Sequence, residues 1–425
     1  MVGTAPVQLE SDPSPFRFDR AELAGAVGDL GVLVPIAVAL IVKNGLTPTA
    51  VLLPAGLLYV VAGLIYRLPV PVQPLKAFGA IAIAHGFGAD DIAAGALLMG
   101  LLFLVLGASG LLDWVAKVFP QPIIRGIQLS VGLLFCQLAW RLVSSTPKSF
   151  TDHRHSVWWL AGATVVVVAV ALLLRRRQIT LVFLAIAVVA LIVAFHGSFT
   201  VGPSAVHVPH LSRAAFAAAA VALVLPQVPL SFANSCLATA DTARTYFGDA
   251  AQRVRTGRLA ITIGLANLFA GSISGMPVCH GAGGMTAHRT FGARSGGAPI
   301  MLGSALIALA LVMGATLTVA LSGFPVPILA GLLTVAGLLH ITLLKDLRGP
   351  WHWALAIAVG ITGFLSNLAV ALVGALVIWW VVHVIRTRRA RHECCLRAAK
   401  RAATSRARDR RRGGAGVRGR SDARR

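Results

Sequence analysis

Two short stretches, PVQPLKAFGAIAIAHG (residues 71–86) and PVCHGAGGMTAHR (residues 277–289), interrupt an otherwise very apolar chain. Each begins with Pro-Val, turns polar, and continues into small residues that suit a helix. Irregular backbone at membrane depth is tolerated only where it is buried in protein or lines a cavity. Broken helices of this kind typically meet at a ligand site near the bilayer midplane. The pair therefore predicts one binding site built from two half-helices.

The composition around these stretches is that of a polytopic membrane protein. Of the 425 residues, 57% are hydrophobic and only 12% are charged. Apolar runs recur that are long enough to cross about 30 Å of hydrocarbon at about 1.5 Å of rise per residue. They predict an all-α fold of about fourteen spans in two sets of seven, in which spans 3 and 10 are short half-helices.

The chain is expected to have five parts. They are a cytoplasmic N-terminal segment (1–20), a first seven-span repeat (21–196), an extracytoplasmic linker (197–212), a second seven-span repeat (213–385) and a basic cytoplasmic tail (386–425). The first segment carries acids and prolines instead of the features of a signal peptide. Lys and Arg concentrate in the loops predicted to be cytosolic, as the positive-inside rule requires. We therefore expect both termini on the cytoplasmic side of the cell membrane.

An internal repeat is visible in the chain. FPQPIIRGIQLSVGLL (119–134) and FPVPILAGLLTVAGLL (324–339) are identical at eight of sixteen positions, at an offset of 205 residues. An odd number of spans in each repeat requires the two copies to be inverted in the bilayer. Inverted repeats are typical of proteins that work by alternating access about a central site.

The net charge of +23 comes largely from the C-terminal tail. Residues 386–425 contain sixteen Lys and Arg against three acids, hence +13, and they lack any apolar period. Such a segment is expected to be disordered and to contact anionic lipid head groups next to the membrane. Specific binding to nucleic acid is not expected, and the five cysteines have no spacing typical of a disulfide framework.

The first interrupted stretch predicts a lysine at the start of a buried half-helix. Its prolines favour extended backbone over 68–73 and a helix from about Pro74, with Gln73 beside the cap and Lys76 in the first turn. A lysine at such depth costs about 2.5–3.5 kcal/mol on insertion scales. A bound anion would offset this cost. The alternatives are a side chain that reaches the interface or an ion pair with Asp29.

The second stretch predicts a glycine-rich helix start. Gly281, Gly283 and Gly284 allow close approach of a ligand to backbone N–H groups, and helix N-termini bind oxyanions readily. Glycines in membrane helices also serve as close-packing surfaces. His280 has three open roles: a hydrogen-bond donor, a titrating group or a core histidine with internal partners. One Cys and one His do not make a metal site.

A third polar run, LPQVPLSFANSCLATADTAR (225–244), contains neutral hydrogen-bonding side chains. Gln227, Asn234 and Ser235 suit the binding of an anion without trapping it, and Pro226 and Pro229 are expected to interrupt the eighth span, near 213–235. The alternative is hydrogen bonding between helices, worth about 0.6–2 kcal/mol for each bond.

Two acids are candidates for proton coupling. Asp29 is the only acid of the first span, and Asp241 is the first acid after the third polar run. A carboxylate within the membrane can carry the proton that drives uptake. For Asp29 a structural pairing with Lys76 is the alternative.

Together these blocks resemble the molybdate transporter family within the sulfate permease superfamily. The resemblance implies a fourteen-span fold of seven plus seven inverted spans, similar to uracil permease, with core and gate subdomains and with uptake of molybdate. It also implies that no regulatory C-terminal domain follows the last span. By the P-V-Q-P-x-K, P-Q-x-P-L…N-S and C-H-G-A-G-G motifs it assigns substrate contacts to Gln73, Lys76, Gln227, Asn234, Ser235, His280, Gly281, Gly283 and Gly284.

The interpretation that we prefer is a secondary transporter of a tetrahedral oxyanion, with molybdate first and sulfate and tungstate as related solutes. A sulfate permease of the same fold and an uncoupled anion channel are the alternatives. A nucleobase transporter would need a carboxylate in spans eight and ten to accept hydrogen bonds from ring N–H groups, and the matching positions here have none. The chain lacks HExxH and GxSxG motifs, and no predicted span contains paired acids, so we expect no enzyme, cofactor or metal. Oligomeric state stays open, with a homodimer as one arrangement.

Overall fold

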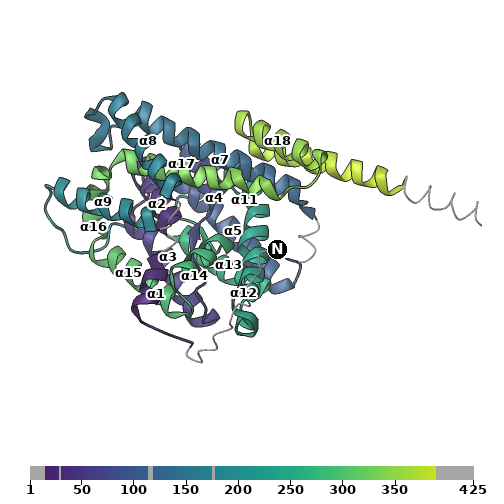
Figure 1. The fold of residues 1–425 in the computed structure, drawn as a ribbon, viewed down its shortest axis with the longest axis horizontal. Helices are drawn as coiled ribbons and strands as arrows, with labels where there is room; N and C mark the ends of the chain where they lie inside the picture. Colours follow the sequence, from purple (N-terminus) through teal and green to yellow (C-terminus); the bar gives the residue numbers. More distant parts are fainter. Residues whose placement is uncertain (1–14, 28–29, 113–117, 175–177, 389–425) are drawn as a thin grey trace, which may run out of the picture. The chain divides into compact units, whose positions relative to one another are not determined.

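The computed structural model describes residues 15–27, 30–112, 118–174 and 178–388, and these residues are mostly helical (Figure 1). By its contacts the chain divides into a large unit, Met1–Leu372, and a small unit, Val373–Arg425. The elements that build the site all belong to the large unit. Asp29 and the tail beyond residue 388 lie outside the described residues, so the expectations for them stay predictions.

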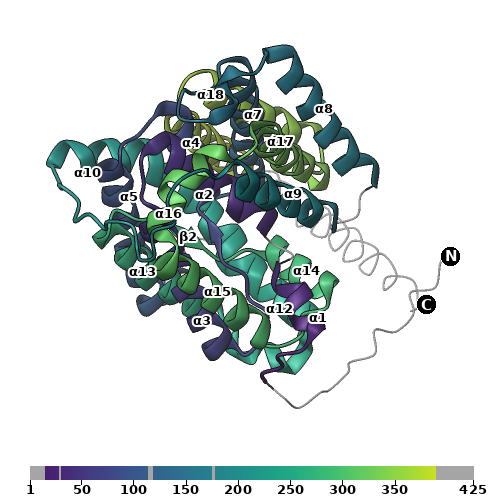
Figure 2. The ribbon, with the colours of Figure 1, turned by 90° about the vertical axis from the view of Figure 1, so that its left-hand side faces the viewer.

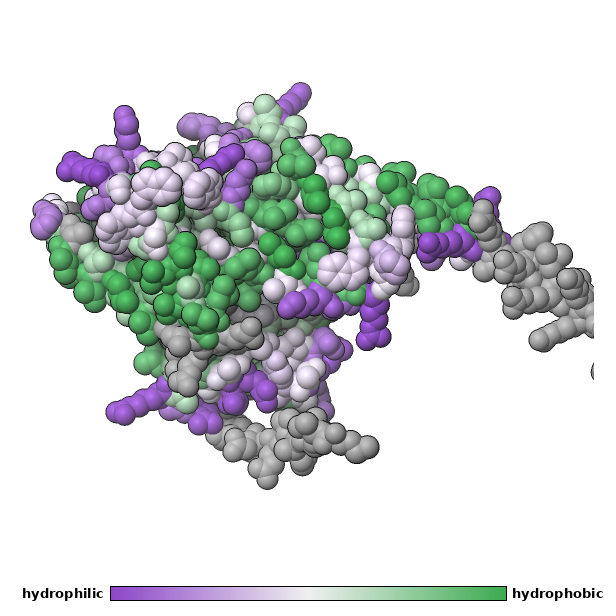
Figure 3. All heavy atoms as spheres, turned by 45° about the horizontal axis from the view of Figure 1, so that its top comes forward, coloured by the Kyte–Doolittle hydropathy of each residue, from purple (hydrophilic) through white to green (hydrophobic). Residues whose placement is uncertain are grey.

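Helices that can cross a membrane account for much of the described chain. Six are long and apolar enough, or up to eight if each of two bent pairs is one span, and three shorter apolar helices add to them. Figure 3 shows hydrophobic atoms over the middle of the visible face of the large unit, with hydrophilic atoms gathered toward its edges. The chain is therefore a multi-pass membrane protein, and the number of fourteen spans stays a prediction. The six helices are α3 (Pro48–Tyr66), α5 (Ala89–Ser109), α7 (Gln121–Ser144), Arg213–Arg253, Val326–Asp346 and Leu368–Arg388.

Two long helix pairs join the halves of the chain. Helix α3 packs along α15 (Gly297–Val312), and α5 packs along α13 (Thr256–Ser272). A Cβ atom on Gly56 would lie 2.9 Å from the carbonyl oxygen of Gly303, and one on Gly100 would lie 2.9 Å from that of Gly264. Both pairs thus use glycines to bring two backbones together, as is common between membrane helices.

The helices that carry the repeated sequence pack against each other. They are α7 and α17 (Val326–Thr342), which lie side by side in Figures 1 and 2. A Cβ atom on Gly132 would lie 2.7 Å from the oxygen of Gly337, and one on Gly337 would lie 2.6 Å from the oxygen of Gly132. These two glycines occupy the same position in the repeat. Reciprocal contact between equivalent residues is what a two-fold axis produces.

The predicted interruption of the eighth span by Pro226 and Pro229 is wrong, because the helix runs through both prolines, and it also continues beyond residue 235. The structure has one continuous helical stretch, Arg213–Arg253, in which two π-helical segments flank the prolines. A proline removes one N–H group and crowds the carbonyl one turn earlier, and a wider turn relieves that conflict. Its parts are α10 (Arg213–Ala219), η3 (Ala220–Val224), α11 (Leu225–Leu230), η4 (Ser231–Ala238), α12 (Thr239–Phe247) and η5 (Gly248–Arg253).

The apolar stretch of residues 297–323 contains a sharp bend. Helix α15 ends at Val312, and the chain bends by 82° before continuing over Gly314–Gly323. Thr49 stabilises the bend from outside the helix, because its hydroxyl donates to Ala310 O at 2.8 Å and accepts from Ser204 N at 2.8 Å. A long-range side chain therefore supplies partners at a break that hydropathy does not show. The bent part contains α16 (Gly314–Ala320) and η6 (Leu321–Gly323).

The N-terminal helix docks on the second half of the chain. Glu22 in α1 (Arg20–Ala26) is buried, and its Oε1 accepts from Arg294 N at 2.8 Å and from Ser295 N at 2.9 Å. The remaining elements complete the large unit. They are α2 (Leu30–Asn44), η2 (Thr151–Arg154), α8 (Val157–Leu174), α9 (Gln178–Ala194), η7 (Leu343–Asp346) and α18 (Pro350–Leu365).

Candidate functional site

The two interrupted stretches meet in a small antiparallel ladder. Strand β1 (Gln73–Pro74) pairs with β2 (Val278–Cys279), with Gln73 opposite Cys279 and Pro74 opposite Val278. Figure 2 shows β2 surrounded by helices. Helix α4 (Lys76–His85) follows β1, and α14 (Ala282–Phe291) follows β2. The prediction that these two stretches lie together is confirmed.

Helix α4 begins slightly later than the sequence indicated. Leu75 is the N-cap, and Gln73 lies in the strand instead of beside the cap. The half-buried Lys76 is the first helical residue, and its Nζ donates to Gln73 Oε1 at 2.5 Å. Leu75 N donates to Pro277 O at 3.1 Å, which extends the ladder up to the helix start. The ladder therefore holds Lys76 at the point where the two halves of the chain meet.

Three elements converge at Gly281, the N-cap of α14. A Cβ atom there would lie 2.5 Å from Gln73 Oε1 and 3.4 Å from Asn234 Nδ2. A side chain at this position would therefore displace Gln73. Gly283 is exposed with open space where a Cβ would lie, whereas Gly284 is buried. The glycine run thus gives one close contact and one open position.

Neither half-helix has a side-chain cap. The first N–H groups of a helix have no partner within the helix, and they carry about half a positive charge together. In α4 one of these groups is used, because Phe78 N donates to Gln227 Oε1 at 3.0 Å. Gln227 Nε2 in turn donates to Ser231 Oγ at 2.8 Å. Gln227 thus connects the first turn of α4 to the eighth span. This contact is the hydrogen bonding between helices that the sequence analysis gave as the alternative to substrate binding.

The other two candidate binding residues of the third polar run, Asn234 and Ser235, lie in the π-helical segment η4. Asn234 is half-buried there with its amide near Gly281, and Ser235 is buried. Thr239 Oγ1 donates to Asn234 O at 2.9 Å, so a side chain satisfies a carbonyl in the widened turn. Single π-helical turns often occur at functional sites. Asp241 lies further along, exposed in the first turn of α12.

His280 is fully buried and has a partner on each ring nitrogen. Its Nδ1 lies 2.8 Å from Pro71 O, and its Nε2 lies 3.0 Å from Thr262 Oγ1. The ring also packs edge-on to Tyr66. Of the three roles left open by the sequence, this geometry fits a core histidine that ties β2 to the stretch before β1.

Sequence reasoning missed two polar side chains of α13 that hold this region. Thr262 binds His280, and the buried Asn267 binds both backbone groups of Val278. The only signal was an asparagine within the apolar run ITIGLANLFAG (261–271).

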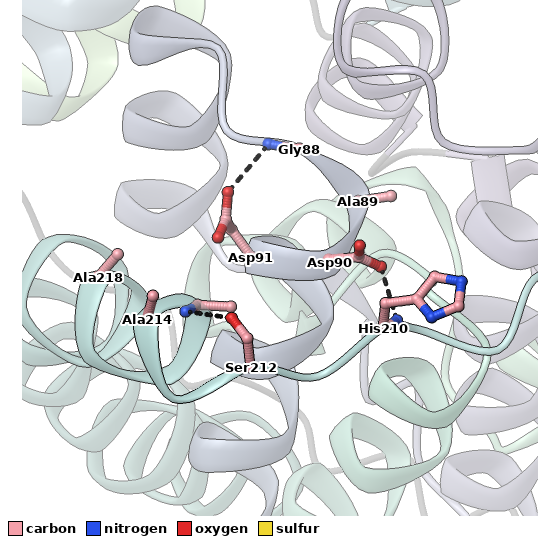
Figure 4. A pocket seen from close by; sticks show the side chains of 9 residues that line it. Gly88, Ala89, Asp90, Asp91, His210, Ser212, Ala214 and Ala218 are labelled. Atoms are coloured by element: carbon pink, nitrogen blue, oxygen red, sulfur yellow. Dashed lines mark hydrogen bonds between the residues drawn. The ribbon is translucent and has the colours of Figure 1, made fainter.

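A separate polar pocket of about 470 Å³ lies at the starts of α5 and α10 (Figure 4). Asp90 Oδ1 accepts from His210 N at 3.0 Å, and Asp91 Oδ2 accepts from Gly88 N at 3.4 Å. Within the described residues no three metal-ligating side chains come together. The carboxylates of Asp90 and Asp91 in this pocket would repel an anion, so the ladder is the better candidate for an anion site.

Comparison with known proteins gives a consistent assignment. Residues 21–135 and 219–339 match the family described as "Molybdate transporter of MFS superfamily". The chain belongs to this molybdate transporter family. The two matched ranges end within α7 and α17, the helices that carry the internal repeat.

Individual members of the molybdate transporter family cover most of the chain. Molybdate transporter 1 of Arabidopsis thaliana is 32% identical over 366 residues, which is 76% of this chain and 79% of that protein. Molybdate transporter 2 of the same plant is 29% identical over 371 residues, 77% of this chain and 79% of that protein. The transmembrane domain of a cyanobacterium bicarbonate transporter, BicA, has a similar fold, with a TM-score of 0.60 and 15% identity over 84% of this chain and 98% of that one.

Proposed function

We propose that this protein is a secondary active transporter that imports a tetrahedral oxyanion, with molybdate as the first candidate. The observation that carries the proposal is the ladder from which both half-helices begin, with Lys76 beside it. Each helix N-terminus contributes about half a positive charge and the lysine contributes one. The site thus offers about two positive charges, which balance a doubly charged oxyanion.

The site residues have distinct roles in this proposal. Lys76 supplies the full charge, and Gln73 and Asn234 orient the oxyanion with their amides. Gly281 and Gly283 present backbone N–H groups, while Ser235 and Gly284 support them from buried positions. Gln227 and His280 act indirectly, because their polar atoms bind the protein itself. The relatives named as molybdate transporters support the choice of solute.

Alternating access forms the second part of the proposal. We infer a seven-plus-seven inverted repeat, supported by the reciprocal contact of Gly132 and Gly337 and by the similar glycine contacts of α3–α15 and α5–α13. A core subdomain that carries the ladder would move against a gate that contains α7 and α17. Proton coupling would use Asp29 or Asp241, with both termini cytoplasmic in a cell membrane.

The test is uptake of radiolabelled molybdate by proteoliposomes that contain the purified protein. We expect accumulation above equilibrium that depends on a proton gradient, together with stronger competition by tungstate than by sulfate. Equal competition by sulfate would favour a sulfate permease of the same fold. Uptake that only equilibrates, whatever the gradient, would favour an anion channel, and no uptake of any oxyanion would refute the proposal.

A further inference from the structure

Strand β2 has one edge that the ladder does not satisfy. β1 covers the opposite edge, and Val278 is fully buried. A buried backbone N–H or C=O group without a partner costs roughly 1–3 kcal/mol. Something else must therefore bind the outer N–H and C=O groups of Val278.

The side chain of Asn267 fills this place. Its Oδ1 accepts from Val278 N at 2.7 Å, and its Nδ2 donates to Val278 O at 2.8 Å. A carboxamide has the same donor and acceptor as a peptide group. Asn267, which is itself fully buried, thus stands where a third strand would pair with β2.

The first strand has less need of such a clamp. Pro74, which lies opposite Val278, has no N–H group. Its carbonyl oxygen lies 3.7 Å from Cys279 Sγ, on the facing strand. Strand β2 is thus fixed to the long helix α13 by one side chain that makes two hydrogen bonds.

The clamp connects the site to a rigid support. Helix α13 packs against α5, where Gly264 meets Gly100. Three residues after Val278 the chain reaches Gly281, the N-cap of α14. A shift of Val278 would therefore move the first N–H groups of α14 relative to Lys76.

We propose that Asn267 is a positioning residue that sets the distance between the α14 N-terminus and Lys76, and so sets affinity and size selectivity for the oxyanion. This inference rests on the proposed function. Loss of the clamp leaves the spacing of these two groups less sharply fixed, so the site binds the oxyanion less tightly and selects less strongly by its size.

The experiment compares wild type, Asn267→Leu and Asn267→Gln in proteoliposomes. For Asn267→Leu we expect a KM for molybdate raised about tenfold or more, by analogy with residues that orient the ligands of a metal ion, whose loss costs about 10–100-fold in affinity. In the same variant, the preference for tungstate over sulfate as a competitor should decrease. Asn267→Gln keeps the carboxamide but displaces it by about 1.5 Å, so an intermediate KM is expected. If Asn267→Leu does not fold, Asn267→Gln alone decides the matter.

Asn44→Leu is the matched control. Asn44 Nδ2 donates to Ala82 O at 2.9 Å and to Phe87 O at 3.0 Å, so the variant also loses two bonds from an amide to backbone, but at the far end of α4. It should lower the unfolding temperature and leave KM and selectivity as in the wild type. Wild-type KM and selectivity in both Asn267 variants would overturn the inference. Failure of the wild type itself to take up any oxyanion would instead refute the proposed function.

Discussion

The two half-helices that start at the ladder differ in what they bring to the site and in what holds them. Helix α4 brings a full charge at Lys76, and its first turn is held by the side chain of Gln227. Helix α14 begins with glycine backbone and has no charged side chain in its first turn, and the strand before it is held by Asn267 and His280. Both helix N-termini attract an anion, but the first half adds a full side-chain charge, while the second adds close backbone approach, although both stretches begin with the same Pro-Val pattern.

The largest effect is expected where the charge is removed. Lys76→Ala takes away about half of the positive charge that faces the dianion, so we expect molybdate uptake to fall at least about 100-fold, a loss of roughly 2.7 kcal/mol. Lys76→Arg keeps the charge and should retain part of the uptake. Initial rates in proteoliposomes at matched protein content measure both. Normal transport by Lys76→Ala would show that the side-chain charge of α4 is not needed, and the proposed difference between the two half-helices would then be wrong.

A smaller loss of transport is expected when a side chain is added at the glycines that precede and begin α14. In Gly281→Ala the new Cβ would lie 2.5 Å from Gln73 Oε1, so the amide and its bond to Lys76 must shift. We expect KM to rise about tenfold, since about 1.4 kcal/mol corresponds to a factor of ten. Gly283→Ala places its Cβ in open space and is the matched control, with at most a small change in KM. Equal effects in the two variants would show that the close contact at Gly281 is irrelevant.

The smallest effect on transport is expected from Gln227→Leu, which tests how α4 is held. The variant leaves Phe78 N without its partner, and we expect it to destabilise the protein by about 1–3 kcal/mol. Thermal unfolding in detergent measures this loss. Because the half-helix keeps Lys76, KM should change less than in Asn267→Leu. A larger rise in KM for Gln227→Leu would mean that Gln227 contacts the solute directly.

The sequence located the ladder well because its signals are local. Prolines exclude helix just before Lys76, and glycines allow the close approach at Gly281, so both breaks are readable from neighbouring residues. The repeat also predicted which helices correspond, and Gly132 and Gly337 then meet in space. The same short motifs predicted the molybdate transporter family, which the family match over residues 21–135 and 219–339 confirms, while the anion site itself stays a proposal.

Other features were misread because a tertiary partner decides them. Pro226 and Pro229 read as a break, yet π-helical turns carry the helix past them. Nothing in the apolar residues near Val312 indicates a bend, yet the chain bends there, and Thr49 of the neighbouring helix α3 donates to Ala310 O beside it. Hydropathy indicates whether a segment is buried in lipid or protein. It does not indicate which group donates a hydrogen bond to each backbone carbonyl.

By itself the sequence determined a helical membrane protein, the two points at which its helices break, and the charge that makes an anion the expected ligand. Only the tertiary structure decided which polar groups are available to a ligand. His280 binds Pro71, 209 residues away in the chain, and Gln227 binds Phe78, 149 residues away. A buried polar group must find a partner, and in a folded chain that partner is chosen by proximity in space, which the order of residues does not specify.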